Sequence, residues 1–169
     1  MSNELVLREN RDAVLTLTMN RPERKNAFNN PLYKAFAAAL QDAQKDDDVH
    51  VVVVTGTAGS FSAGQDFSEM NAAPTGDSGP HGFQVLMDTL CSFDKPLIAA
   101  VNGVAVGIGM TMLLHCDVVY LAESVRMRCP FVTLGVVPEA ASSYLLPLII
   151  GFQRAAEVLY TAQWIDAPR

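Results

Sequence analysis

The spacing of apolar residues predicts strands and helices that alternate along the chain. Residues 13–20 alternate between apolar and polar side chains, which is typical of a strand with one buried face. Residues 49–56 and 95–103 contain aliphatic runs without alternation, which favours strands of a parallel sheet covered on both faces. Residues 117–122 predict one more strand.

Between these strands, apolar residues recur at the spacing of a helix. Residues 31–44 are rich in alanine and begin with Pro31, which suits a first helical turn. Strands that alternate with helices predict an α/β fold with mostly parallel sheets flanked by helices. The other predicted helices cover residues 83–93, 108–115, 139–150 and 153–162.

Composition narrows the class of protein. The 169 residues fit one domain, 1–169, and half of them are hydrophobic, which is enough for a sizeable core. A net charge of -6 argues against nucleic-acid partners and against a basic membrane-binding face. No apolar stretch has the length of a membrane span and no secretory signal pattern is visible, so we expect a cytoplasmic location. Cys91, Cys116 and Cys129 are expected to be reduced thiols in or near the core.

Two stretches carry glycine shortly after a predicted strand. One is SFSAGQDF (60–67), and the other is NGVAVGIGMTMLL (102–114), where a helix is predicted to follow at once. A helix start leaves backbone N–H groups unpaired, and two such groups aimed at one point stabilise a developing oxyanion. Turns from strand to helix also use glycine for purely conformational reasons, so the pattern alone leaves both interpretations open. Neither stretch has the spacing of a phosphate-binding loop or of a dinucleotide fingerprint.

Four blocks of sequence, in this order, resemble the crotonase superfamily of enoyl-CoA hydratases and isomerases. They are NRPERKNAFN, VVVVTGTAGSFSAGQDF, KPLIAAVNGVAVGIGMTMLLHCDVVYLAES and PFVTLGVVPEAASSYLLP, and the resemblance runs from about residue 5 to the end. It implies a crotonase-like spiral of ββα units that binds an acyl-CoA thioester across the sheet. Coenzyme A would enter as part of the substrate, and neither a metal nor a separate cofactor is implied.

The resemblance also assigns roles to residues. It implies that the backbone amides of Gln65 and Ile108 form an oxyanion hole, and that the segment around Lys25 helps to hold the nucleotide. A thioester enolate concentrates charge on one oxygen, so two fixed donors in a dry pocket stabilise it strongly. Asp66 is expected first to bond the backbone of its own turn. The implied substrate-binding residues are Lys25, Ala27, Ala63, Gly64, Asp66, Gly107, Thr111, Phe131 and Leu134.

Three positions favour one reaction of the family over the others. Hydratases of the family resemble one another in carrying two glutamates, and the matching positions here are Thr111 and Phe131. Without these carboxylates, the chain lacks the groups that would activate a water and donate a proton. A glutamate does stand further along, Glu139 in VVPEAASSY, and this pattern resembles the Δ3,Δ2-enoyl-CoA isomerases. It implies that Glu139 shuttles a proton and converts a 3-enoyl-CoA into a 2-enoyl-CoA.

Other interpretations of Glu139 and of the whole chain stay open. Glu139 also fits an acid in the first turn of the helix predicted over 139–150, where it favours the helix dipole. A helix start lowers a carboxyl pKa, whereas a base benefits from a raised one, so catalysis requires burial beside apolar neighbours such as Phe131 and Leu134. The alternative functions are another enolate-forming reaction, including enoyl-CoA hydration, and a non-catalytic acyl-CoA binder or assembly subunit.

Family members of this type are longer by several helices, which cover the acyl pocket and build a trimer. The chain ends at TAQWIDAPR, where a further helix is expected, so we interpret it as a core domain without those helices, either a fragment or a short form. The expected assembly is a homo-oligomer, a trimer or a dimer of trimers. His115 and Asp117 lack further ligands at metal-binding spacing. His81 lies in the breaker-rich segment 71–82, which looks mobile, and is expected to be solvated.

Overall fold

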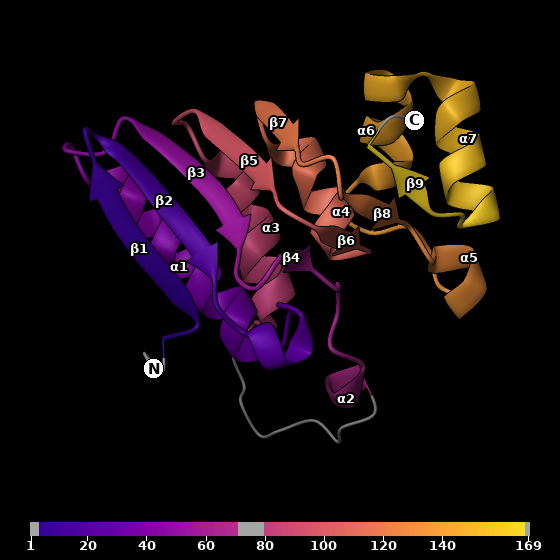
Figure 1. The fold of residues 1–169 in the computed structure, drawn as a ribbon, viewed down its shortest axis with the longest axis horizontal. Helices are drawn as coiled ribbons and strands as arrows, with labels where there is room; N and C mark the ends of the chain where they lie inside the picture. Colours follow the sequence, from indigo (N-terminus) through magenta and orange to yellow (C-terminus); the bar gives the residue numbers. More distant parts are fainter. Residues whose placement is uncertain (1–3, 71–79, 168–169) are drawn as a thin grey trace.

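The computed structural model describes residues 4–70 and 80–167, which form two sheets with helices around them (Figure 1). Most of the segment expected to be mobile, residues 71–79, lies outside the described residues. The larger sheet contains β1 (Val6–Arg11), β2 (Val14–Met19), β3 (Val51–Gly56), β5 (Leu97–Val101) and β7 (Val118–Leu121). They lie in the order β1-β2-β3-β5-β7, with an antiparallel hairpin at β1-β2 and parallel pairing from β2 onwards.

The burial of β3 differs in part from the sequence prediction. Val52 and Val54 are buried, but the residues that alternate with them are only half-buried. The prediction that this strand is covered on both faces is therefore wrong for the described residues. The reason is visible in Figure 1, where α1 (Asn30–Lys45) and α3 (Gly82–Ser92) pack together on one face of the sheet.

The smaller sheet consists of four short strands: β4 (Ser60–Ser62), β6 (Val104–Val106), β8 (Arg126–Arg128) and β9 (Ile165–Asp166). β4, β6 and β8 run parallel, and β9 pairs antiparallel with β8. Each of the three parallel strands follows a strand of the larger sheet, which gives the successive units β3-β4, β5-β6 and β7-β8. Helical segments follow each unit, and this confirms the predicted α/β fold with its crotonase-like spiral of ββα units.

Helix boundaries depart from the sequence prediction at two places. The helix predicted over 108–115 is a turn of α-helix, α4 (Ile108–Thr111), followed by a 3-10 helix, η2 (Met112–His115). The helix predicted from residue 139 begins only at Ser142, because Ala140 and Ala141 adopt left-handed conformations with φ of 51° and 54°. The other helical segments are η1 (Pro22–Arg24), α2 (Phe67–Met70), α5 (Phe131–Leu134), α6 (Ser142–Ile150) and α7 (Phe152–Thr161).

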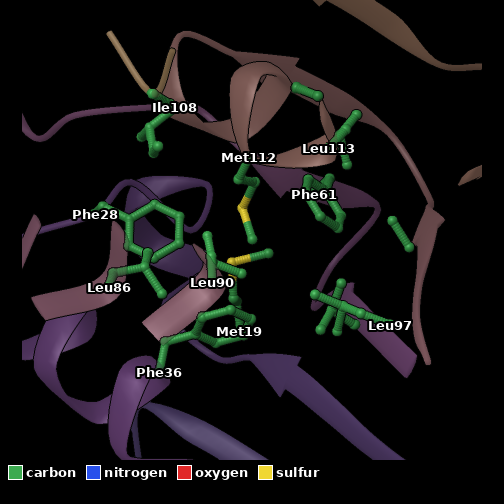
Figure 2. Close-up of a cluster of buried hydrophobic side chains, with 14 of the residues drawn as sticks. Met19, Phe28, Phe36, Phe61, Leu86, Leu90, Leu97, Ile108, Met112 and Leu113 are labelled. Carbon is green, nitrogen blue, oxygen red and sulfur yellow. The ribbon is translucent and has the colours of Figure 1, made fainter. Parts of the chain in front are cut away.

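The hydrophobic core lies between the larger sheet, α1 and α3, and it extends to α4 and η2 (Figure 2). Phe28, Phe61, Leu86 and Met112 are fully buried there. Phe28 also stacks on Tyr33, with ring centroids 4.7 Å apart. The core therefore fixes the segments that follow β4 and β6, because Phe61 belongs to β4 and Met112 to the turn after α4.

The cysteines are all free thiols. Cys129 is buried and Cys116 is half-buried, in agreement with the expectation of thiols in or near the core. Cys91 is exposed on α3, so that expectation is wrong for this residue. Cys91 follows the buried Leu90 and lies on the solvent-exposed side of the helix.

Large apolar side chains are exposed in the second half of the chain. The outermost strand of the larger sheet, β7, is exposed along its whole length. Further exposed side chains lie on α6 and α7 (Leu148, Ile149, Phe152 and Tyr160). Within the part of the chain that the structure describes, no helix has the length and hydrophobicity to cross a membrane.

Candidate active site

The two glycine-containing stretches meet because the strands before them are parallel neighbours. β4 pairs with β6, so their carboxyl ends lie at the same edge of the smaller sheet. The turn after β4 carries Gly64, and the turn after β6 carries Gly107. A Cβ atom on Gly64 would lie 2.6 Å from the carbonyl oxygen of Val106, at the end of β6. Glycine is therefore required here for close contact between the two turns, beyond the conformational need that its φ of +92° imposes.

The second turn presents the amide of Ile108. Gly107 has a φ of 52° and a ψ of -123°, which L side chains rarely adopt. This conformation ends β6 and starts α4 within one residue. Ile108 is the first residue of α4, so its N–H has no acceptor within the helix.

The first turn presents the amide of Gln65. Phe28 forms a parallel bridge with Gln65, in which Phe28 donates to the Gly64 carbonyl at 2.7 Å and accepts from the Asp66 amide at 2.8 Å. In such a bridge the N–H of the middle residue points to the opposite side. The N–H of Gln65 is therefore directed away from Phe28. Its side chain is fixed separately, since Tyr33 donates a hydrogen bond to Oε1 at 2.8 Å.

Gln65, Ile108 and Glu139 all line one cavity with a volume of about 680 Å³. Its wall is mainly apolar and also includes the predicted residues Ala63, Gly64, Gly107, Phe131 and Leu134. Glu139 is the only carboxylate among the described residues of this wall. A mostly apolar cavity with a few fixed polar groups is the usual form of a small-molecule site. The two residues that carry the candidate main-chain donors and the one acid thus line the same cavity.

Glu139 is held by one oxygen only. The hydroxyl of Thr111 donates to Oε1 at 2.6 Å. Oε2 is buried and has no hydrogen-bond partner among the described residues. Burial raises the pKa of Glu139 to about 7, and the hydrogen bond from Thr111 opposes this rise. A carboxyl group with this pKa can take up and release a proton near neutral pH.

The turn that carries Glu139 is fixed by hydrogen bonds from two directions. Ser142 bonds to the carbonyl of Glu139 through both its amide, at 2.9 Å, and its hydroxyl, at 2.6 Å. From η2, the Nε2 atom of His115 lies 3.0 Å from the carbonyl oxygen of Ala140. Left-handed alanines are costly, so a pair of them at residues 140 and 141 persists only because these contacts define the turn.

The prediction that Glu139 stands in the first turn of a helix is wrong. The residue lies three positions before the first residue of α6, and Ala141 is the residue at the helix cap. The helix dipole is thus not the main influence on its carboxyl, and burial decides the direction of the pKa.

The remaining predicted site residues lie next to the cavity rather than in its wall. Thr111 is buried behind Glu139, and Ala27 is buried near the turn after β4. Lys25 is exposed, and its backbone carbonyl accepts from the amide of Ala63 at 2.9 Å. Asp66 accepts from the amide and the hydroxyl of Ser68 within its own turn. A role for Lys25 in holding a nucleotide stays a prediction.

Sequence reasoning missed the polar residues that brace the Gln65 turn. Arg21 forms an ion pair with Asp66 at 2.6 Å and also donates to the carbonyl of Ala27. Asn26 is fully buried, accepts from the Arg21 amide and donates to the carbonyl of Ser60. Both residues belong to NRPERKN, which reads as an exposed loop by composition. Asn26 has a φ of 55°, a conformation that asparagine tolerates better than most residues, but the sequence alone does not show it.

His81, for which the sequence left a role at the acyl entrance as the lesser alternative to solvation, contributes to the cavity wall. It is exposed, as expected, and its Nδ1 accepts from the amide of Phe83 at the start of α3. His115 contacts the turn after Glu139 through the carbonyl oxygen of Ala140. Among the described residues, no group of three or more His, Cys, Asp or Glu side chains is placed to hold a metal ion.

Comparison with known proteins supplies the family. The enoyl-CoA hydratase/isomerase family model matches residues 9–168. The chain belongs to the enoyl-CoA hydratase/isomerase family. An enoyl-CoA hydratase from Mycobacterium marinum has a similar structure, with a TM-score of 0.90 and 47% sequence identity, over 97% of this chain and 78% of that chain. The resemblance to the crotonase superfamily that the four sequence blocks indicate is therefore confirmed.

Relatives within the enoyl-CoA hydratase/isomerase family bear the names of different reactions. The 2,3-dehydroadipyl-CoA hydratase of Escherichia coli is 40% identical over an alignment of 171 positions that covers 99% of this chain and 65% of the relative. Enoyl-CoA delta isomerase 2 of Rattus norvegicus is 36% identical over 159 residues, which cover 91% of this chain and 40% of the relative. The chain thus spans less than two thirds of either relative. Family membership by itself does not choose between hydration and isomerisation.

Proposed function

We propose that the protein moves a double bond in an enoyl-CoA thioester, from the 3-position to the 2-position. One observation carries the proposal. Among the described residues, one carboxyl group lines the same cavity as Gln65 and Ile108; one of its oxygens has no hydrogen-bond partner there, and its pKa is raised to about 7. This is the set of groups that a proton shuttle on a thioester requires.

The proposed reaction begins with ionised Glu139. The carboxylate takes a proton from C2 of the 3-enoyl thioester, and the electrons of that C–H bond pass into a dienolate. The negative charge gathers on the thioester oxygen, where the N–H groups of Gln65 and Ile108 stabilise it. Glu139 then returns the proton to C4, which leaves the double bond between C2 and C3. The proton count balances and no electrons leave the substrate, so the proposed reaction requires no redox cofactor.

The residues in and beside the cavity wall favour isomerisation over hydration. Addition of water needs a group that activates the water and a group that donates a proton. The positions matching the two hydratase glutamates hold Thr111, which is committed to Glu139, and Phe131, which has no polar atom in its side chain. Hydration is kept as the second candidate because the E. coli relative at 40% identity is named a hydratase.

We further propose that the protein acts as a homo-oligomer. The apolar side chains exposed on β7, α6 and α7 support this, because monomers rarely leave so many together in water. Light scattering on the purified chain measures its mass in solution. A monomer at all concentrations would contradict this part of the proposal.

The function is tested by incubating the protein separately with a 3-enoyl-CoA and a 2-enoyl-CoA. Double-bond migration and hydration are followed as separate products by chromatography and mass spectrometry. We expect migration from the 3-enoyl substrate and little hydration of the 2-enoyl substrate. Hydration as the dominant reaction would select the second candidate. Binding of the thioester without conversion of either substrate would show a non-catalytic binder.

A further inference from the structure

The hydroxyl of Thr111 stands between the acid and the oxyanion donors. Its oxygen lies 2.6 Å from Oε1 of Glu139 and 3.2 Å from the carbonyl oxygen of Gly107. The side chain is almost fully buried, at 1% exposure, so water does not compete for these contacts. Thr111 is the last residue of α4, the short helix whose first residue supplies the Ile108 amide.

A hydroxyl at this position can serve both protonation states of Glu139. It has one proton to donate and lone pairs to accept. When Glu139 is ionised, the hydroxyl donates to Oε1. When Oε1 carries a proton, the Thr111 hydroxyl can accept a hydrogen bond from Oε1–H and donate its own hydrogen bond to the Gly107 carbonyl. Neither arrangement requires a heavy atom to move.

The Gly107 carbonyl belongs to the same peptide unit as the Ile108 N–H. Hydrogen bonds to a peptide carbonyl polarise the unit and strengthen its N–H as a donor. This carbonyl already accepts from the amides of Met110 and Thr111 at 2.9 Å and 2.8 Å. The Thr111 hydroxyl adds to that set when it is not donating to Glu139.

We propose that Thr111 is a positioning residue that holds Oε1 of Glu139, sets the acidity of the carboxyl group, and links the acid to the Gly107–Ile108 peptide. The inference rests on the proposed function for its role in turnover. The pairing of the two side chains is independent of which reaction follows. Thr111 occupies a position where the hydratases of the family carry a glutamate. In the structure, its hydroxyl donates a hydrogen bond to the carboxylate of Glu139, which comes from another segment of the chain.

Other charged or titratable groups around Glu139 do not replace this contact. Burial raises the pKa of Cys129 to about 12, so its thiol stays neutral. His115 is engaged with the Ala140 carbonyl. Arg128 and His81 line the same cavity, but no ion pair joins either to Glu139 within the described residues. Loss of the Thr111 hydroxyl would therefore leave the ionised carboxyl without a hydrogen-bond donor among the described residues.

The test is a direct titration of the Glu139 carboxyl carbon by NMR in the unliganded protein. Thr111→Val removes the hydroxyl and keeps the shape, and Thr111→Ser keeps the hydroxyl. We expect Thr111→Val to raise the midpoint of the Glu139 titration by about one pH unit, because the ionised form loses its donor. Thr111→Ser should restore the parent midpoint. An unchanged midpoint in Thr111→Val would overturn the proposal, whatever the protein does to enoyl-CoA.

Thr89→Val provides a matched control. Thr89 is also a buried helical threonine, and its hydroxyl donates to the Val85 carbonyl one turn earlier at 2.8 Å. It lies on α3 and does not line the cavity. Thr89→Val should lose about as much stability as Thr111→Val but leave the midpoint of the Glu139 titration unchanged. If Thr111→Val does not fold, Thr111→Ala replaces it in the same comparison with Thr111→Ser.

Turnover gives a second readout. Thr111→Val should lower kcat for double-bond migration about tenfold with little change in KM, and move the acidic limb of the pH profile upward. In a Glu139→Gln background, Thr111→Val should have no further effect, because the pair acts as a unit. Equal losses in Thr111→Val and Thr111→Ser would mean that packing, not the hydroxyl, matters. Absence of migration in the parent protein would refute the proposed function, while the titration would still decide the pairing.

Discussion

The turn that carries Gln65 and the turn that carries Glu139 face one cavity, but they are held in place by different means. The Gln65 turn is held mainly by main-chain pairing, and the side chains of Arg21 and Tyr33 brace it. It follows β4, pairs with Phe28, and touches β6 through a glycine that admits no side chain. The Glu139 turn follows no strand, contains two left-handed alanines, and is tied by side chains from η2 and α6. Backbone donors are thus fixed by sheet geometry, whereas the acid is fixed by tertiary contacts.

This difference predicts that substitutions affect the two turns in different ways. The amides of Gln65 and Ile108 survive substitution of their own side chains, provided that the glycines before them remain. Glu139 depends on its carboxyl, and its acidity depends on burial and on Thr111. Activity should therefore depend on the chemical nature of the side chain at position 139. At the two glycine turns, it should depend on whether an added side chain fits.

The largest expected effect is chemical and falls on the acid. Glu139→Gln keeps the shape but removes the proton acceptor, so double-bond migration should fall about 1,000-fold. Binding of the CoA thioester should be nearly unchanged, since the amide still fills the wall. Enzyme assays and calorimetry measure the two quantities. Glu123→Gln, at an exposed glutamate, is the control and should retain full activity. Activity close to that of the parent in Glu139→Gln would remove this residue from the mechanism.

The next effect is steric and falls on the donors. Gly64→Ala places a Cβ against the Val106 carbonyl, so the free energy of unfolding should fall by about 2–4 kcal/mol. Displacement of the Gln65 amide should also lower kcat about 100-fold. Gly59 also has a positive φ, of +66°, but its Cβ position is open. Gly59→Ala should therefore cost only about 1 kcal/mol and leave kcat in place. Similar losses in both variants would show that close contact between the turns is unimportant.

Sequence patterns predict the parts of the fold that are long and periodic. β2, α1, α3 and α7 all extend over enough residues for their apolar spacing to be recognised. β4, β6 and β8 have three residues each and β9 has two, too few to show a period. These strands form because they pair with each other, which is tertiary information. The smaller sheet, which positions both glycine turns, was therefore not predicted strand by strand.

The candidate site was predictable to a similar extent. Glycine placement and the resemblance pointed to Gln65 and Ile108, because their role depends on backbone shape that glycine reveals. The environment of Glu139 was not predictable, since a proline, a glutamate and two alanines resemble the start of a helix. Only the structure shows that Ala140 and Ala141 are left-handed and that Thr111 reaches the carboxyl. Arg21 and Asn26 were missed because polar residues in a loop are usually solvated.

A third test separates burial of the acid from its chemistry. Glu139 has an ordinary pKa near 4.5 when unfolded and about 7 when folded. Between these values the unfolded chain is ionised while the folded chain still holds the proton, so stability falls as the pH rises from 4.5 through 7. Gln has no such penalty. We subtract the free energy of unfolding of the parent from that of Glu139→Gln. This difference should be about 2–3 kcal/mol larger at pH 8 than at pH 4, so the variant gains stability over the parent as the pH rises. Urea denaturation at the two pH values measures it, and a pH-independent difference would argue against a buried, raised carboxyl.

The smallest effect tests the strain in the Glu139 turn. Ala141 is exposed with a φ of 54°, so Ala141→Gly relieves a left-handed alanine and should raise the free energy of unfolding by about 0.5 kcal/mol. Ala38→Gly, at an exposed position inside α1, should lower it by about 1 kcal/mol, because glycine weakens a helix interior. Opposite signs in thermal unfolding would show that the turn stores strain, and a loss in both variants would show that it does not. Because glycine also loosens the turn, kcat of Ala141→Gly should fall a few-fold while the protein becomes more stable, the expected cost of a catalytic acid held by strain.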